Sequence, residues 1–367
     1  MADNPIGVKT LTGGTEQSYV EDELTDPAAL AEQDRCTAEI KRLQWPLPKI
    51  DTPLGHMPLV SVMIATRNRL PMLRTLLTQL SKQSYPNYEV VVLDNSDPPI
   101  GPTNLHTAVK YFWTAIHDLG ALRNLLVLLA CGEILLFVDD DSYVRDDFIE
   151  RHAALHLSPQ GSKAAVVQGH CIGVPGDQRG NGWVNRACVY RPQEVMLSTL
   201  QTANCSIKKS AVESIGGFNM SLRFGGEDSE IGQRLVKLGH TILNAPQVLS
   251  IHRGASGGGT REHAHNGYRA EAGRIADRAL IHASVDGPLV GALSLGKYLL
   301  RRLASQPRDL LPLVKESVTC FCRNLPQNTG KSRPAHLQLA KNLYTAFKTP
   351  VSHVGIGSSH VQLPAIH

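Results

Sequence analysis

The sequence lacks several features that would place it in a simple class. It has no N-terminal apolar segment of the kind found in signal peptides, and no CxxC pair that would indicate a zinc site. Its longest apolar run, from Leu125 to Val138, is interrupted by Gly132 and Glu133 and is too short to cross a bilayer. The net charge of +4 is too small to indicate a nucleic-acid partner. We therefore expect reduced cysteines, a cytoplasmic location and no nucleic-acid binding.

Two common nucleotide-binding motifs are also absent. No GxGxxG follows the first predicted strand, which argues against a dinucleotide site, and no GxxxxGK[ST] occurs, which argues against a P-loop. What is present is a chain of 367 residues, of which 42% are hydrophobic and 19% charged. This composition is sufficient for a sizeable folded core.

Composition and periodicity divide the chain into three segments. Residues 1–58 contain an acidic stretch, a predicted helix and a proline-rich linker. Residues 59–280 alternate apolar strands with amphipathic helices, which predicts an α/β domain with a mostly parallel central sheet flanked by helices. The two halves of this domain are expected at 59–145 and 146–280. Residues 281–367 hold ten Lys/Arg and three acids, and are expected to form a basic, partly helical extension. A peripheral membrane contact, a homodimer contact or a solvated helical face would each explain that extension.

Polar side chains follow each of the three clearest predicted strands. The strand endings are Thr66-Arg67-Asn68, Asp94-Asn95-Ser96 and Asp139-Asp140-Asp141. Because ligands of open parallel sheets bind outside the carboxyl ends of the strands, these three endings predict the rim of one polar pocket. Adjacent carboxylates repel one another, and a divalent cation commonly holds such a group together.

Five segments, in this order, resemble family 2 glycosyltransferases of the GT-A fold. They are Val60 to Arg69, Val91 to Ser96, Leu122 to Asn124, Gly132 to Asp141 and Gly225 to Glu230. The resemblance spans residues 59–255 and implies a GT-A type, Rossmann-like sandwich, with the nucleotide-binding half at 59–145 and the acceptor half at 146–280. It implies a hexosyltransferase-type enzyme that moves a sugar from a UDP-, GDP- or TDP-sugar to a sugar or other hydroxyl acceptor, with inversion. Mn²⁺ or Mg²⁺ is the implied cofactor. Leu122 departs from the small residue usual at its position.

The resemblance assigns a metal site to the aspartate triplet, which then corresponds to the DXD motif. It implies that Asp141 binds the metal, that Asp139 binds the metal or the ribose, and that Asp140 lies against the donor. Carboxylate oxygens suit Mg²⁺ and Mn²⁺. His252 is a further implied ligand, and His263 and His265 are weaker candidates. An acidic surface turn, and a structural histidine, are the alternatives.

The resemblance also places five residues around the nucleotide: Thr66, Arg67, Asn68, Asp94 and Arg123. Asp94 would accept a hydrogen bond from a ring N–H of the base, which uracil, thymine and guanine have and adenine lacks. Arg123 would contact the base or the diphosphate. Structural alternatives are a helix N-terminus for the first three residues, a strand-end turn for Asp94 and a surface charge for Arg123.

The acceptor side is assigned from the acidic pair near residue 228. In similar inverting enzymes the aspartate is the catalytic base, so the resemblance implies that Asp228 takes the proton from the acceptor hydroxyl. Glu227 would orient the acceptor, and Asn204 and Trp183 are further acceptor-side candidates. Acids are favoured at helix starts in any case, and Trp183 fits a core position equally well. The glycine-rich loop 254–267 is expected to close over the donor.

Two other functions stay open. A sugar-1-phosphate nucleotidyltransferase also uses an α/β sheet, aspartates and Mg²⁺, but usually has a glycine-rich loop where this chain has Ala65 to Arg69. A non-catalytic nucleotide-binding or scaffold protein would be expected to have lost the DXD motif or the acidic pair, and this chain retains both.

Overall fold

The computed structural model describes residues 8–9, 25–43, 46–47, 57–101, 109–175, 200–222, 225–254, 268–305, 310–324 and 338. Within these residues nine strands form one sheet, in the order β1-β4-β3-β2-β5-β8-β7-β9-β6. The strands are β1 Val8–Lys9, β2 Val60–Thr66, β3 Tyr88–Asp94, β4 Lys110–Thr114, β5 Ile134–Val138, β6 Ser142–Tyr143, β7 Val166–Gly173, β8 Asn204–Lys208 and β9 Ile242–His252. The helices are α1 Pro27–Leu43, α2 Leu70–Leu80, α3 Leu119–Leu129, α4 Phe148–Leu157, α6 Lys209–Ser214, α7 Glu227–Lys237, α8 Tyr268–Asp286, α9 Pro288–Ser305 and α10 Leu310–Asn324.

The sheet is parallel where the nucleotide-binding half was predicted. Strands β4, β3, β2 and β5 run side by side in the same direction. Strand β8 then enters antiparallel to both β5 and β7, and β9 returns parallel to β7. The predicted α/β fold, a mostly parallel central sheet flanked by helices with a helical C-terminal extension, is confirmed.

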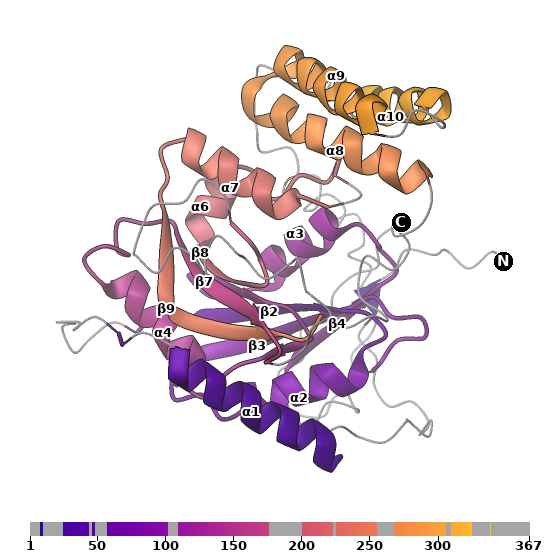
Figure 1. Cartoon of the computed structure of the whole chain (residues 1–367). Helices are drawn as coiled ribbons and strands as arrows, with labels where there is room; N and C mark the ends of the chain where they lie inside the picture. The colour runs from indigo at the N-terminus through magenta and orange to yellow at the C-terminus, as the bar shows by residue number, and fades with distance from the viewer. Residues whose placement is uncertain are drawn as a thin grey trace, which may run out of the picture.

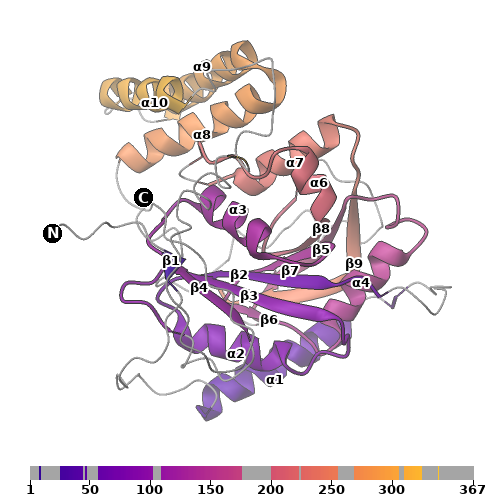
Figure 2. The ribbon, with the colours of Figure 1, turned by 180° about the vertical axis from the view of Figure 1, so that it is seen from behind.

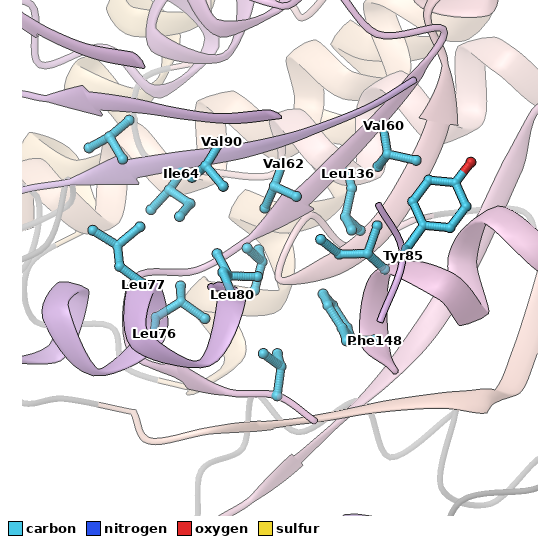
Figure 3. Close-up of a cluster of buried hydrophobic side chains, with 14 of the residues drawn as sticks. Val60, Val62, Ile64, Leu76, Leu77, Leu80, Tyr85, Val90, Leu136 and Phe148 are labelled. Carbon is cyan, nitrogen blue, oxygen red and sulfur yellow. The ribbon is translucent and has the colours of Figure 1, made fainter. Parts of the chain in front are cut away.

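Helices cover both faces of the sheet, as apolar strands require (Figures 1 and 2). Helices α3, α6 and α7 pack on one face, and α2 and α4 on the other. Figure 3 shows the second core, where Val62 and Leu136 of neighbouring strands lie above Leu76 and Leu80 of α2. The leucine spacing of α2 therefore buries one helical stripe, which fixes the loop between β2 and α2 at the carboxyl edge of the sheet.

Helix α1 packs on the α/β domain and is not a separate unit. Its Cys36 and Ile40 are fully buried in a cluster with Tyr143, Leu249 and Ile251 of β6 and β9. The helix predicted for the acidic N-terminal segment is thus present, and it lies against the edge of the sheet near the ends of β6 and β9.

Helices α8, α9 and α10 form a layer of their own beyond α7 (Figure 1). Ala276, Leu280, Leu295 and Phe321 belong to one buried cluster shared by the three helices. Residue 280, where the domain boundary was expected, lies inside α8. Helix α8 packs with the two helices that follow it. In the described part of the chain, no helix combines the length and apolarity that crossing a membrane requires.

Candidate active site

The three polar strand endings meet at the carboxyl edge of the sheet. Thr66 stands opposite Asp94 in the parallel β2–β3 register, and the backbone N–H of Asn95 donates to the carbonyl of Thr66 at 3.0 Å. The Thr66 hydroxyl donates to Asp140 at 2.8 Å, across to the loop that follows β5. The predicted rim is therefore a connected hydrogen-bonded structure.

Asp139, Asp141 and His252 converge on one point beside this rim. Each offers a ligand atom, and the three atoms lie within 4.8 Å of one another. A turn closed by the Ser142 N–H and the Asp139 carbonyl (3.2 Å) leads into β6, which pairs Ser142 with His252. Asp139 and His252 are 113 positions apart in the sequence, and the sheet brings them together. Two carboxylates and one imidazole form a donor set that suits a divalent cation such as Mn²⁺ or Mg²⁺.

The charges of this cluster act strongly on His252. Its Nε2 lies 3.2 Å from Asp139 and 3.3 Å from Asp141, and its Nδ1 accepts the Gly254 N–H at 3.1 Å. Burial alone would lower the pKa of His252, but the hydrogen bond to Asp139 and the two negative charges outweigh it and raise the pKa to about 9. Because a metal ligand must be unprotonated, cation binding here would release a proton.

Asp140 faces the other way, into the protein. It is buried and accepts hydrogen bonds from Thr66 and from Arg69, the latter at 3.0 Å. Burial and the neighbouring Asp141 charge raise its pKa to about 7, against the opposing effect of Arg69. Arg69 also lies 3.4 Å from Asp141, so this one guanidinium holds two of the three aspartates. Its role was not predicted, although it belongs to the same turn as Thr66.

Arg67, Asn68 and Asp94 line the adjoining loops. Arg67 is buried against His117, with 2.9 Å between Nη1 and Nδ1, and Asn68 adopts a left-handed φ of 53° with its N–H on Ser96. The two oxygens of Asp94 accept hydrogen bonds from three donors, the N–H groups of Ser96 and Ile100 and the hydroxyl of Tyr111. These contacts match the alternative of a strand-end turn, and a role for Asp94 with the base stays a prediction.

Arg123 and Glu227, predicted for opposite ends of the substrate, form a buried ion pair. Arg123 Nη1 contacts Glu227, and Nη2 donates to the Thr202 hydroxyl at 2.5 Å. Burial would lower the pKa of Arg123, but the charges of Glu227, Asp228 and Asp139 outweigh it and raise that pKa. The charge of Asp139, in the predicted metal cluster, thus acts on the same guanidinium that contacts Glu227.

The acidic pair begins helix α7 after a turn that requires glycine. Gly226 has a φ of 93°, and a Cβ there would lie 2.9 Å from Ile281 of α8. Glu227 is fully buried, whereas Asp228 is half-buried, with one oxygen accepting the Ser229 N–H at 2.7 Å. The two acids are thus placed differently: Glu227 is fixed by Arg123, and Asp228 keeps a partly exposed carboxylate.

The structure gives less support to the remaining acceptor-side candidates. Asn204 is fully buried, and its side chain contacts His152, the His170 carbonyl and Ser250 at 3.0 Å each. These contacts place the Asn204 side chain in the core, and its acceptor role stays a prediction. Trp183, His263, His265 and the loop from residue 255 to 267 lie outside the described residues.

Part of the chain is similar to a glycosyltransferase family and to two curated proteins. Residues 61–221 match the family model "Glycosyl transferase family 2". The O-antigen biosynthesis protein RfbC of Myxococcus xanthus is 26% identical over 258 residues, covering 61% of this chain and 20% of RfbC. The putative glycosyltransferase EpsH of Bacillus subtilis (strain 168) is 27% identical over 100 residues, covering 26% of this chain and 29% of EpsH. The chain thus spans less than a third of either relative.

Solved structures give weaker likenesses. The mannosyltransferase PcManGT from Pyrobaculum calidifontis, in complex with GDP-Man and Mn²⁺, shares 17% identity and a TM-score of 0.46, over 86% of this chain and 94% of that one. S. aureus TarS 1-349 in complex with UDP-GlcNAc shares 17% identity and a TM-score of 0.48, over 73% and 81%. Both TM-scores are below 0.5, so the assignment rests on the family match. That match contains the rim, the aspartate triplet and Arg123, and ends before Glu227, Asp228 and His252. Over residues 61–221 the chain is therefore similar to glycosyl transferase family 2.

Proposed function

We propose that this enzyme transfers a sugar from a nucleoside-diphosphate sugar to an acceptor hydroxyl, with a divalent cation and with inversion at the anomeric carbon. The observation that carries the proposal is the convergence of Asp139, Asp141 and His252 at the carboxyl edge of the sheet. The acidic pair on α7 supports it, because Arg123 links that pair electrostatically to the same cluster.

The residues divide the work of donor binding. Asp139, Asp141 and His252 would hold Mn²⁺ or Mg²⁺, and a bound cation would offset the negative charge that develops on the departing nucleoside diphosphate. Arg69 fixes the carboxylates of Asp140 and Asp141, so that they need no rearrangement when the donor arrives.

The acceptor side needs one base and no enzymic nucleophile. Asp228 is half-buried at the start of α7 and would take the proton from the acceptor hydroxyl as its oxygen attacks the anomeric carbon. Glu227 is held by Arg123, which fixes the orientation of the turn that presents Asp228. A single displacement of this kind inverts the anomeric carbon.

The base assignment is tested with Asp228→Asn. This change should keep nucleotide-sugar affinity, measured by calorimetry with Mn²⁺ and each of UDP-, GDP- and TDP-sugars, while lowering transfer about 10²- to 10⁴-fold. Asp147→Asn is the matched control, because Asp147 also begins a helix, where it pairs with Arg151 at 2.7 Å. A transfer rate for Asp228→Asn equal to that of the control would refute the assignment.

The metal assignment is tested with Asp141→Asn. Removing one carboxylate from the cluster should weaken Mn²⁺-dependent nucleotide binding by about 10-fold or more, since the ligand set loses a negative oxygen donor. Unchanged calorimetric affinity would show that the cation binds elsewhere. Consumption of added pyrophosphate, with formation of a nucleoside triphosphate and a sugar 1-phosphate from the nucleotide sugar, would instead indicate the nucleotidyltransferase alternative. Binding without turnover would indicate the non-catalytic one. The anomeric configuration of the product, assigned by NMR, tests inversion.

A further inference from the structure

The outer face of α9 is the most exposed apolar surface among the described residues. Leu289 is 72% exposed, and Leu293 and Leu300 are each 67% exposed, more than any other large hydrophobic side chain in the described ranges. Val290, at 38%, extends the same face. Helix α9 lies in the outermost layer, on the side of α8 away from the sheet (Figures 1 and 2). A contiguous leucine face of this kind usually marks an interaction surface.

Packing against α8 fixes the direction in which this face points. On the opposite side of α9, Leu295 is buried, and Gly291 lies so close to α8 that an added Cβ would stand 2.4 Å from the Ala283 Cβ. Helix α9 therefore cannot rotate to bury its leucines without losing this close contact. The leucines at positions 289, 293 and 300 recur at helical spacing, so they lie on one stripe.

Cations accompany the leucines, and acids do not. Lys297 and Arg301 are exposed, one helical turn apart, between and beside the leucines. Helix α9 contains no Asp or Glu. Two copies of this face would bring like charges together, whereas an anionic bilayer surface offers opposite charge to the cations and an apolar boundary to the leucines. Charge complementarity thus favours lipid over a second copy of the chain.

We propose that the α9 face, defined by Leu289, Val290, Leu293, Lys297, Leu300 and Arg301, binds the surface of an anionic lipid bilayer. The helix would lie in the plane of the interface, with its leucines at the boundary between headgroups and acyl chains and its cations at the level of the lipid phosphates. Because Ile281 of α8 lies against Gly226, the layer that binds lipid also contacts the turn that presents Asp228. The proposal does not depend on the sugar-transfer reaction.

The test is flotation of the full chain with vesicles of phosphatidylcholine, with and without phosphatidylglycerol. The wild-type chain should float only with the anionic vesicles, and less so at high salt. Reversing both charges with Lys297→Glu and Arg301→Glu should lower partitioning by more than about 30-fold, since the loss of each interfacial cation alone costs about fivefold and the added carboxylates are repelled by the anionic surface. Leu293→Ser with Leu300→Ser should lower it about 10-fold or more, because apolar burial is lost. Leu238→Ser, at a 50% exposed leucine after α7, and Lys82→Glu, at an exposed lysine after α2, are controls that should bind as wild type.

A second measurement needs no variant. Hydrogen exchange of the wild-type chain should slow in peptides covering residues 288–305 when anionic vesicles are added, and stay unchanged with phosphatidylcholine alone. Absence of flotation and of this protection would overturn the proposal. Equal binding by the α9 variants and the controls would do the same. A dimer in sedimentation velocity that Leu293→Ser with Leu300→Ser dissociates, without vesicle binding, would assign the face to a second copy and refute the lipid proposal.

Discussion

Lowering the pH from 7 to 5 should remove about 4 kcal/mol of unfolding free energy through two histidines of α4 alone. His152 and His156 are enclosed between α4 and β8, where both contact the Ser206 hydroxyl, at 2.8 and 2.9 Å. Burial lowers the pKa of His152 to about 4 and that of His156 to about 3, the latter also through its neighbours His152 and Lys208. Both rings are therefore neutral in the folded protein at pH values where the unfolded chain binds protons.

The sign and size follow from proton linkage. A base whose pKa is lowered by folding contributes stability above its unfolded pKa of 6.5, and that stability is lost as the pH falls toward the folded value. Both histidines have pKa values below 5 in the folded protein. The loss of unfolding free energy between pH 7 and 5 therefore depends almost entirely on the protonation of these histidines in the unfolded chain. It amounts to about 2 kcal/mol for each ring.

The assay is urea unfolding at both pH values in wild type and His156→Leu. Asp140 in the folded protein, with a pKa of about 7, and His252 in the unfolded chain, with a pKa of 6.5, titrate over the same range, so the informative quantity is the difference between the two proteins. His156→Leu should reduce the loss by about 2 kcal/mol. Ser206→Ala is the matched control, since it removes the same hydrogen bonds but leaves both rings, and should keep the wild-type pH dependence. An equal loss in wild type and His156→Leu, or a His156 ring resonance that titrates near pH 6.5 in NMR, would refute the reasoning.

Two further predictions concern stability. Glu227→Gln should lower the free energy of unfolding in urea by about 3–5 kcal/mol, because it leaves the buried Arg123 charge without its charged partner. Asp286→Asn, in the exposed pair with Lys237, should lower it by less than about 1 kcal/mol. Equal losses would show that the Arg123 pair is solvated. Gly291→Ala should destabilise by about 1–3 kcal/mol through its clash with Ala283, whereas Gly296→Ala, where an added Cβ meets nothing within 4 Å, should stabilise by about 0.5–1 kcal/mol. Changes of the same sign at the two glycines would contradict the packing of α9 on α8.

The sequence predicted the elements that depend on local pattern. The apolar run before Asp139 gives β5, the leucine spacing after Arg69 gives α2, and the polar strand endings give the rim at the sheet edge. These features need only strand and helix periodicity and the geometry of a parallel sheet. Strand β9 begins at Ile242, and its first half contains Asn244, a polar residue that interrupts the apolar pattern.

The partners of individual side chains were not predictable. Arg123 and Glu227 are 104 residues apart in the sequence. From sequence spacing alone, Glu227 and Asp228 are equally plausible as the residue that contacts the acceptor. Their division into a buried anchor and a half-buried carboxylate depends on which side of the helix start faces Arg123. The partners of Asp94 were equally unpredictable, because its three hydrogen-bond donors come from a loop and from β4. The domain boundary was unpredictable because it depends on how α8 packs with α9 and α10.

The aspartate triplet shows how one turn gives chemically similar neighbours different tasks. The turn from Asp139 to Ser142 directs Asp139 and Asp141 toward His252, and Asp140 toward Arg69 and Thr66. Because Asp140 points away from His252, Asp139 and Asp141 are the two members of the triplet that could share a cation. Asp140 instead connects the turn to β2 through its hydrogen bond with Thr66. The turn therefore explains why two acids separated by one residue face the same side. What makes this spacing a candidate metal site is the distant strand β9, which brings His252 to the two acids that face it.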